Sequence, residues 1–175
     1  KVVADMIKWP VKDRPAEARV KEIVSRKGEA GGDIRALIRS FNLCEAFPGK
    51  VSAEASSISD TVEGRDLDYR IDLREKSIIT IDGADAKDLD DAVSVERLPG
   101  GNFLLGVHIA DVSHYVKEGA PIDKEALKRG TSIYLIDWVI PMLPRELSNG
   151  ICSLTPGHDR LALSVSMEID ERGEV

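Results

Sequence analysis

The chain has 175 residues, of which 42% are hydrophobic and 31% charged, the ordinary composition of a soluble globular protein. Its apolar runs are too short to cross a membrane and no signal-peptide pattern opens the chain, so a cytoplasmic protein is expected. Cys44 and Cys152 form no CxxC motif, which predicts two free thiols rather than a disulfide or a zinc site.

The charge is unevenly distributed along the chain. The net charge of −7 by itself disfavours a nucleic-acid partner. Residues 1–50, however, carry 11 Lys and Arg against 7 Asp and Glu, a net charge of +4, and the remainder carries −11. A local basic surface is enough to contact phosphates. Taken alone, this distribution favours an ordinary solvated surface over an RNA contact.

The first fifty residues predict a hairpin followed by a helix. Residues 1–9 and 18–27 are typical of strands, and the prolines of Pro10–Pro15 mark the turn between them. Asp33 is the predicted N-cap of an amphipathic helix over residues 34–41, whose apolar positions follow the i, i+3, i+4, i+7 pattern.

The remaining elements predict an α+β fold, a mixed or antiparallel sheet with flanking helices. Glycine and proline mark the stops, among them the hairpin turn at 99–102 and Gly130 after a helix. The expected order is helix 51–59, an extended charged connection 60–76, strands 77–81, 92–98 and 103–110, helix 121–128, strand 132–136, mostly loop over 141–157, and strand 160–169.

The stretch Thr80–Val93 places five aspartates between apolar, strand-like residues: Asp82, Asp85, Asp88, Asp90 and Asp91. Clustered carboxylates need full solvation, a basic partner or bound cations, because burying a bare charge is costly. In an extended chain Asp88 and Asp90 project to one face and Asp91 to the other, and a turn at Gly83 would fold Asp82 back toward the first face.

Two interpretations of this aspartate run are equally supported by the residues alone: a solvated acidic turn and a divalent-metal site. An all-oxygen set of ligands suits Mg²⁺ or Mn²⁺ better than zinc. An EF-hand calcium loop starting at Asp85 is excluded, because Lys87 and Leu89 occupy positions that require acids.

The motif Thr80-Ile-Asp-Gly-x-Asp-Ala-x-Asp-x-Asp-Asp-Ala-Val93 resembles the signature of the ribonuclease II superfamily catalytic domain, the RNB domain, and most closely its bacterial ribonuclease R branch. Further segments match in the same order: Val107–Ser113, Arg129–Tyr134, Val139–Pro144 and Leu147–Leu154. Residues 1–30 resemble, more weakly, the end of the OB-type cold-shock domain that precedes it. The resemblance therefore implies three parts: 1–30, the end of the cold-shock domain; 31–76, a helical and extended connection; and 77–175, the N-terminal half of the RNB domain.

The resemblance implies a hydrolytic 3′-to-5′ exoribonuclease that releases 5′-nucleoside monophosphates from the 3′ end of single-stranded RNA and acts as a monomer. Its catalytic and metal-binding aspartates map onto Asp82, Asp88, Asp90 and Asp91, which would hold two Mg²⁺ ions, with Mn²⁺ as a substitute. Asp85 has no role in that set. Asp90, at the centre of the run, is expected to be the most sensitive position.

Tyr134 matches the family tyrosine that packs near the terminal nucleotide, and base stacking on a phenol ring is sequence-tolerant. His108, Asp111 and His114 are expected to be structural, since a two-metal mechanism needs no histidine base. The family's catalytic domain is about twice as long as residues 77–175, beyond ordinary variation in domain size. The chain alone is therefore expected to be inactive. The alternatives are an RNA-binding module and an inactive scaffold of the RNB family.

Overall fold

The computed structural model describes residues 1–136 and 138–175. The chain divides into two compact units. The first unit comprises Lys1–Ala46 and Ile133–Ile140, and the second comprises Phe47–Ser132 and Pro141–Val175. Each unit has its own antiparallel pairing of strands, and the aspartate run belongs to the second unit.

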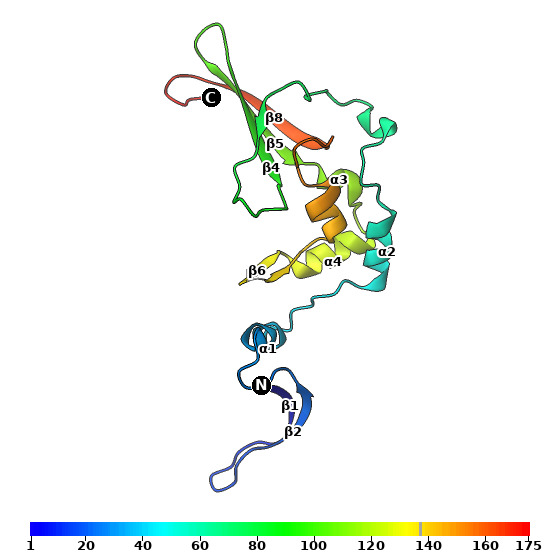
Figure 1. Ribbon diagram of the computed structural model, residues 1–175, viewed down its shortest axis with the longest axis vertical. Coiled ribbons are helices and arrows are strands. Elements are labelled where there is room, and N and C mark those ends of the chain that lie inside the picture. Colours follow the sequence, from blue (N-terminus) through cyan, green and yellow to red (C-terminus); the bar gives the residue numbers. More distant parts are fainter. Residues whose placement is uncertain (137) are drawn as a thin grey trace. The chain divides into compact units, whose positions relative to one another are not determined.

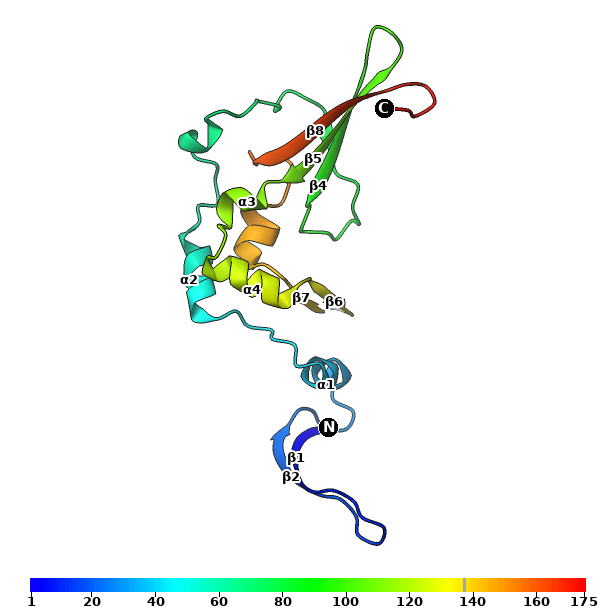
Figure 2. The same ribbon diagram turned by 180° about the vertical axis from the view of Figure 1, so that it is seen from behind.

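The described residues of the first unit form two antiparallel strand pairs and a helix, labelled in Figures 1 and 2. Strands β1 (Val2–Lys8) and β2 (Glu17–Ile23) pair antiparallel, as predicted, and α1 (Gly32–Ser40) follows. Strands β6 (Ile133–Leu135) and β7 (Trp138–Ile140) form the second pair, of which the sequence predicted only β6.

The predicted N-cap of α1 is wrong. Gly31 occupies the cap with a φ of 71°, and no side chain caps the helix there. Asp33 lies inside the first turn, and its carboxylate pairs with the Lys1 ammonium. A glycine reaches this left-handed conformation without strain, while an acid in the first turn is favoured by the helix dipole.

The second unit is built on a four-stranded antiparallel sheet in the order β3–β4–β5–β8. The strands are β3 (Ile78–Ile79), β4 (Asp91–Arg97), β5 (Phe103–Ala110) and β8 (Ala162–Ile169). The predicted hairpin turn closes through a 2.8 Å bond from the Leu98 amide to the Asn102 carbonyl. The strand predicted over 77–81 is shorter than expected: only two residues pair with β4, and the chain then turns into the aspartate run.

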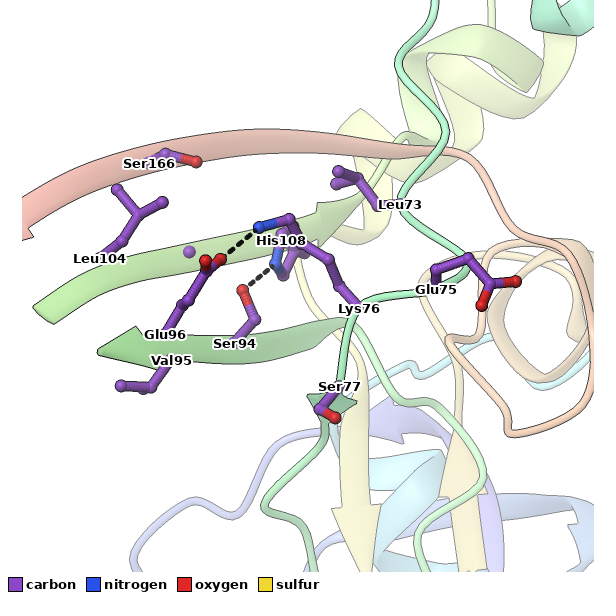
Figure 3. A pocket seen from close by; sticks show the side chains of 11 residues that line it. Leu73, Glu75, Lys76, Ser77, Ser94, Val95, Glu96, Leu104, His108 and Ser166 are labelled. Carbon is purple, nitrogen blue, oxygen red and sulfur yellow. Dashed lines mark hydrogen bonds and ion pairs between the residues drawn. The ribbon is translucent and has the colours of Figure 1, made fainter. Parts of the chain in front are cut away.

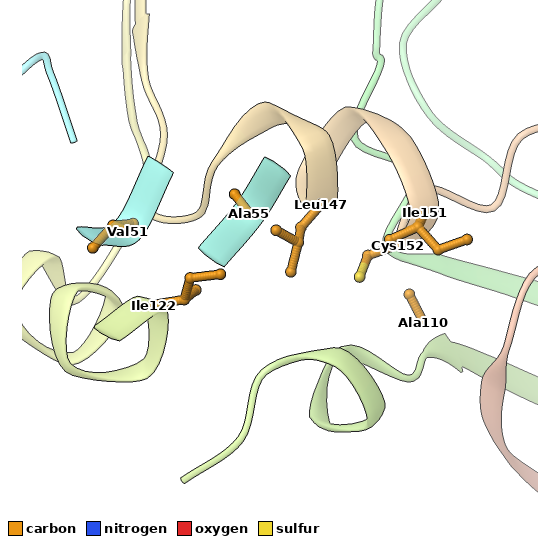
Figure 4. Close-up of a cluster of buried hydrophobic side chains, with 7 residues drawn as sticks. All are labelled: Val51, Ala55, Ala110, Ile122, Leu147, Ile151 and Cys152. Atoms are coloured by element: carbon orange, nitrogen blue, oxygen red, sulfur yellow. The ribbon is translucent and has the colours of Figure 1, made fainter. Parts of the chain in front are cut away.

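The helices of the second unit gather around one hydrophobic core (Figure 4). Helix α2 (Gly49–Ser57) and helix α4 (Pro121–Arg129) occur where the sequence predicts them, and Gly130 ends α4 with a φ of 74°. The buried cluster takes residues from both helices, from the end of β5 and from a π-helical turn: Val51, Ala55, Ala110, Ile122, Leu147, Ile151 and Cys152.

Three short helical elements were not predicted. They are the 3₁₀ turn η1 (Gly64–Leu67) within the connection, α3 (Val112–Tyr115) directly after β5, and the π-helical turn η2 (Leu147–Ile151) within the expected loop. Each is too short to display helical periodicity in the sequence. Leu147 and Ile151 are nevertheless buried, so η2 packs into the core and joins it to the residues that follow.

The fold class is thus the predicted α+β, with antiparallel sheets and few helices. Across the two described ranges, no helix is both long and apolar enough to cross a membrane.

Candidate functional site

The aspartate run forms the link between β3 and β4. Asp82, Asp85, Asp88 and Asp90 lie in this link, and Asp91 is the first residue of β4. Asp88 is half-buried, whereas Asp82, Asp90 and Asp91 are exposed. A turn closed by the Ala86 amide and the Gly83 carbonyl, 3.0 Å apart, reverses the chain in the middle of the link.

Four of these carboxylates are electrostatically coupled. The pKa of Asp90 is raised above its ordinary value, first because the surrounding protein partly removes its carboxyl group from water. The negative charges of Asp88, Asp91 and Asp82 raise it further. The structure therefore brings Asp82, Asp88 and Asp91 close enough to Asp90 for their charges to disfavour its ionisation.

The coupled carboxylates do not, however, surround a single point in the way that the ligands of a bound metal do. Within residues 1–136 and 138–175, no three His, Cys, Asp or Glu side chains converge as metal binding requires. The donor chemistry nevertheless fits a hard divalent cation, because every donor is a carboxylate oxygen. A cation among them would offset the repulsion that raises the pKa of Asp90.

The backbone of the run is anchored to two neighbouring elements. The Leu154 amide, just beyond η2, donates to the Leu89 carbonyl at 2.8 Å. The Ala110 amide, at the end of β5, donates to the Asp90 carbonyl at 2.9 Å. The carboxylates thus project from a segment whose main chain is hydrogen-bonded both to the residues after η2 and to the sheet.

His108 lies on the polar face of the sheet, where it is 4% exposed (Figure 3). Its Nε2 lies 3.0 Å from the Ser94 hydroxyl and its Nδ1 lies 2.8 Å from the Ser164 hydroxyl. Burial, followed by the nearby Lys76 ammonium, lowers the pKa of His108. These bonds occupy both ring nitrogens, so the imidazole packs within the sheet beside a pocket of about 270 Å³.

Asp111 and His114 join α3 to the charged connection. The Arg70 guanidinium donates to Asp111 at 2.7 Å, and the His114 Nε2 lies 3.1 Å from the Asp66 carboxylate. Burial alone would raise the pKa of Asp111, but hydrogen bonds from Arg70 and Ser113 outweigh it and hold that pKa below its ordinary value. The two side chains therefore bind structural partners in the described chain.

Cys152 is a free thiol, as predicted, is 2% exposed and belongs to the core. Desolvation, aided by the charges of Asp90 and Asp111, raises its pKa to about 12. The thiol is therefore neutral at physiological pH, and a thiolate nucleophile at this position is disfavoured.

Tyr134 lies in β6 opposite Val139, and its residue is 64% exposed. It belongs to the first unit, whereas the aspartates belong to the second. Its place beside a terminal nucleotide stays a prediction.

Sequence reasoning missed the residues that anchor the aspartate run from outside it, among them Ser153 and Leu154. They lie in the last of the matching motifs, Leu147–Leu154, which was the one available signal. That motif carried no indication of where its residues would pack.

Two protein families match the chain. The RNB domain matches residues 70–175, and the cold shock domain matches residues 1–48. The first match covers more than half of the chain and includes every aspartate of the run.

Relatives and solved structures agree with these matches. Ribonuclease R of Thermotoga maritima is 56% identical over 177 residues, covering 100% of this chain and 25% of that protein. RNase R of Mycoplasma genitalium, solved in complex with double-stranded RNA, is 31% identical with a TM-score of 0.86, covering 99% of this chain and 31% of that one. Yeast Ssd1, a pseudonuclease, shares the fold at 23% identity and a TM-score of 0.69, covering 95% of this chain and 21% of that one. The chain spans about a quarter of the length of the curated relatives it matches.

Proposed function

This chain belongs to the RNB domain family, and we propose that it is the metal-binding part of a hydrolytic 3′-to-5′ exoribonuclease that releases 5′-nucleoside monophosphates. The predicted resemblance to the ribonuclease R branch is confirmed by relatives of that name. Because the chain spans about a quarter of those relatives, the activity is proposed for the longer protein of which this segment forms part.

The observation that carries the proposal is the RNB domain match over residues 70–175, which includes Asp82, Asp88, Asp90 and Asp91. The pKa of Asp90, raised first by partial burial and then by the charges of its three neighbours, is consistent with a cluster that a bound cation would stabilise. Asp82, Asp88, Asp90 and Asp91 would hold two Mg²⁺ ions, with Mn²⁺ as a substitute. When bound, such ions supply Lewis-acid chemistry: activation of a water molecule and stabilisation of charge on the leaving 3′ oxygen.

The chain's own residues would place and bind the RNA. The excess of Lys and Arg in residues 1–50 is compatible with contact to phosphates, while some of these side chains, such as Lys8, Arg35 and Arg39, already pair with nearby acids. Tyr134 presents an exposed ring on which a terminal base would stack. The RNA complex of the Mycoplasma relative supports RNA as the partner. The proposed complete enzyme is a cytoplasmic monomer.

A chimaera tests this proposal in a complete enzyme. The matching quarter of Thermotoga maritima ribonuclease R is replaced by this chain, and mononucleotide release is measured from RNA with a single-stranded 3′ end. We expect Mg²⁺-dependent release by the chimaera. Asp90→Asn should abolish hydrolysis while RNA binding is retained, because the substitution removes a metal-binding charge at nearly constant size.

Asp85→Asn is the matched control, since it makes the same change of charge in the same link. It should leave turnover intact. Normal turnover by the Asp90→Asn chimaera would contradict the metal assignment. A folded chimaera that binds RNA but releases no mononucleotides, with or without Asp90, would instead favour an RNA-binding module or an inactive scaffold.

A further inference from the structure

Ser153 is completely buried, at 0% exposure. Its hydroxyl forms hydrogen bonds with the backbone of the aspartate run. The hydroxyl donates to the Lys87 carbonyl at 2.8 Å and accepts from the Leu89 amide at 3.0 Å. A serine hydroxyl has one hydrogen to donate and lone pairs to accept, so these two bonds use its donor and one acceptor site.

Asp88 is the residue between these two contacts. Because one side-chain oxygen holds the carbonyl before Asp88 and the amide after it, the peptide groups on both sides of Asp88 are fixed in orientation. The backbone dihedrals of Asp88 are then restricted, and with them the direction in which its carboxylate leaves the chain.

Ser153 is itself held in place. It follows η2, whose Leu147 and Ile151 are buried in the core, and its own carbonyl accepts a 3.0 Å bond from the Arg160 guanidinium. The neighbouring Leu154 amide adds a bond to the Leu89 carbonyl at 2.8 Å. Ser153, which fixes the backbone around Asp88, is therefore part of the packed core.

We propose that Ser153 is a positioning residue of the metal centre, whose hydroxyl presets the backbone at Asp88 so that its carboxylate meets the cation without reorganising the link. This inference rests on the proposed function, because it presumes that the aspartates bind a divalent metal. Groups that orient metal ligands contribute to affinity by reducing the freedom that the ligands lose on binding.

The test is a Mn²⁺ titration of the chimaera described above, which serves as the parent protein and contains the complete enzyme around the aspartates, with free Mn²⁺ followed by electron paramagnetic resonance. Ser153→Ala removes both hydrogen bonds and should weaken Mn²⁺ binding about tenfold or more. Exchange of the Leu89 amide with solvent should also accelerate, since that amide loses its acceptor. Ser153→Cys places a somewhat larger and weaker hydrogen-bonding group at this position, so its Mn²⁺ affinity should fall between that of the parent and that of Ser153→Ala.

Two further variants separate positioning from general stability. Ile122→Val trims the same core away from the aspartate run, so it should lower the melting temperature and leave Mn²⁺ affinity unchanged. Asp90→Asn provides the reference for a damaged metal centre. Where Ser153→Ala does not fold, as judged by circular dichroism, the comparison is made with Ser153→Cys.

The outcomes distinguish the two proposals. If the parent protein binds Mn²⁺ more tightly than Asp90→Asn but the Ser153 variants bind like the parent, Ser153 is not a positioning residue and the metal centre stands. If the parent and Asp90→Asn bind Mn²⁺ equally, the metal centre is overturned, and the role of Ser153 with it. A loss of affinity in Ile122→Val equal to that in Ser153→Ala would also overturn the positioning role.

Discussion

Asp111 combines several bonds in one carboxylate at the point where β5 ends and α3 begins. It accepts from the Arg70 guanidinium at 2.7 Å, from the Ser113 hydroxyl at 2.8 Å and from the His114 amide at 3.1 Å. The last bond makes Asp111 the N-cap of α3. Its side chain is 14% exposed, so solvent screens these interactions only in part.

Asp111→Asn should destabilise the second unit in a pH-dependent way. The pKa of Asp111 in the folded chain lies below its ordinary value of 3.8, so its carboxylate favours folding at pH values above about 3.8. The substitution should cost about 1–2 kcal/mol at pH 7. As pH falls below 3.8 and through the lowered pKa, the carboxylate loses this advantage and the two proteins should converge.

Urea unfolding of both proteins at pH 7 and at several values below pH 4 measures this difference. Asp123→Asn is a comparison variant, since Asp123 accepts a bond from the Gly119 amide at an exposed site. A constant difference in free energy across the pH range would contradict the role given to the Asp111 carboxylate.

At the scale of the elements, the His108 ring fits into the sheet only because residue 106, two positions earlier on β5, is a glycine. A Cβ on Gly106 would lie 2.8 Å from the His108 Nε2 and closer still to the Ser94 hydroxyl. Gly106 therefore clears the space in which the imidazole and the serine hydroxyl meet across β4 and β5.

Gly106→Ala should destabilise the chain by about 1–3 kcal/mol, because the added methyl group overpacks the sheet. Gly100→Ala is the matched control: its Cβ would meet open space, so that the change should be small. Adding Ser94→Ala to Gly106→Ala should recover part of the loss by removing one of the two close contacts. Thermal unfolding measures all three, and a Gly106→Ala variant as stable as the parent would contradict the packing described here.

At the scale of the whole molecule, the chain is two units and about a quarter of its relatives' length. Because the chain spans so little of those relatives, we propose that residues outside this segment complete the site around the RNA phosphate. The aspartates would then bind metal weakly, because part of the coordination comes from a positioned phosphate.

The isolated chain should therefore release few or no mononucleotides from RNA. Uniformly labelled RNA incubated with the chain and Mg²⁺, followed by chromatography of the products, measures this directly. The chimaera described above, on the same RNA, is the positive control. Robust release of mononucleotides by the 175-residue chain would contradict this expectation.

Much of the fold could be predicted because its signals are local. Strand β5 covers the predicted residues 103–110, and α4 ends at the predicted Gly130, since periodicity and stop residues act over a few positions. Short elements such as α3 and the cap of α1 could not be predicted. They depend on single residues, such as the Asp111 side chain that caps α3 and the left-handed Gly31 that begins α1.

In the candidate site too, some features could be predicted from the sequence and others could not. The sequence by itself determined the oxygen-rich chemistry of the aspartate run and, through ordered motifs, its family. Only the tertiary structure decided which groups act on that run: the charges gathered around Asp90, and the hydroxyl of Ser153, which lies 66 and 64 positions from its partners Lys87 and Leu89. Residue type and spacing follow from the chain, whereas the packing of η2 into the hydrophobic core brings such distant residues into contact, and no local pattern encodes that packing.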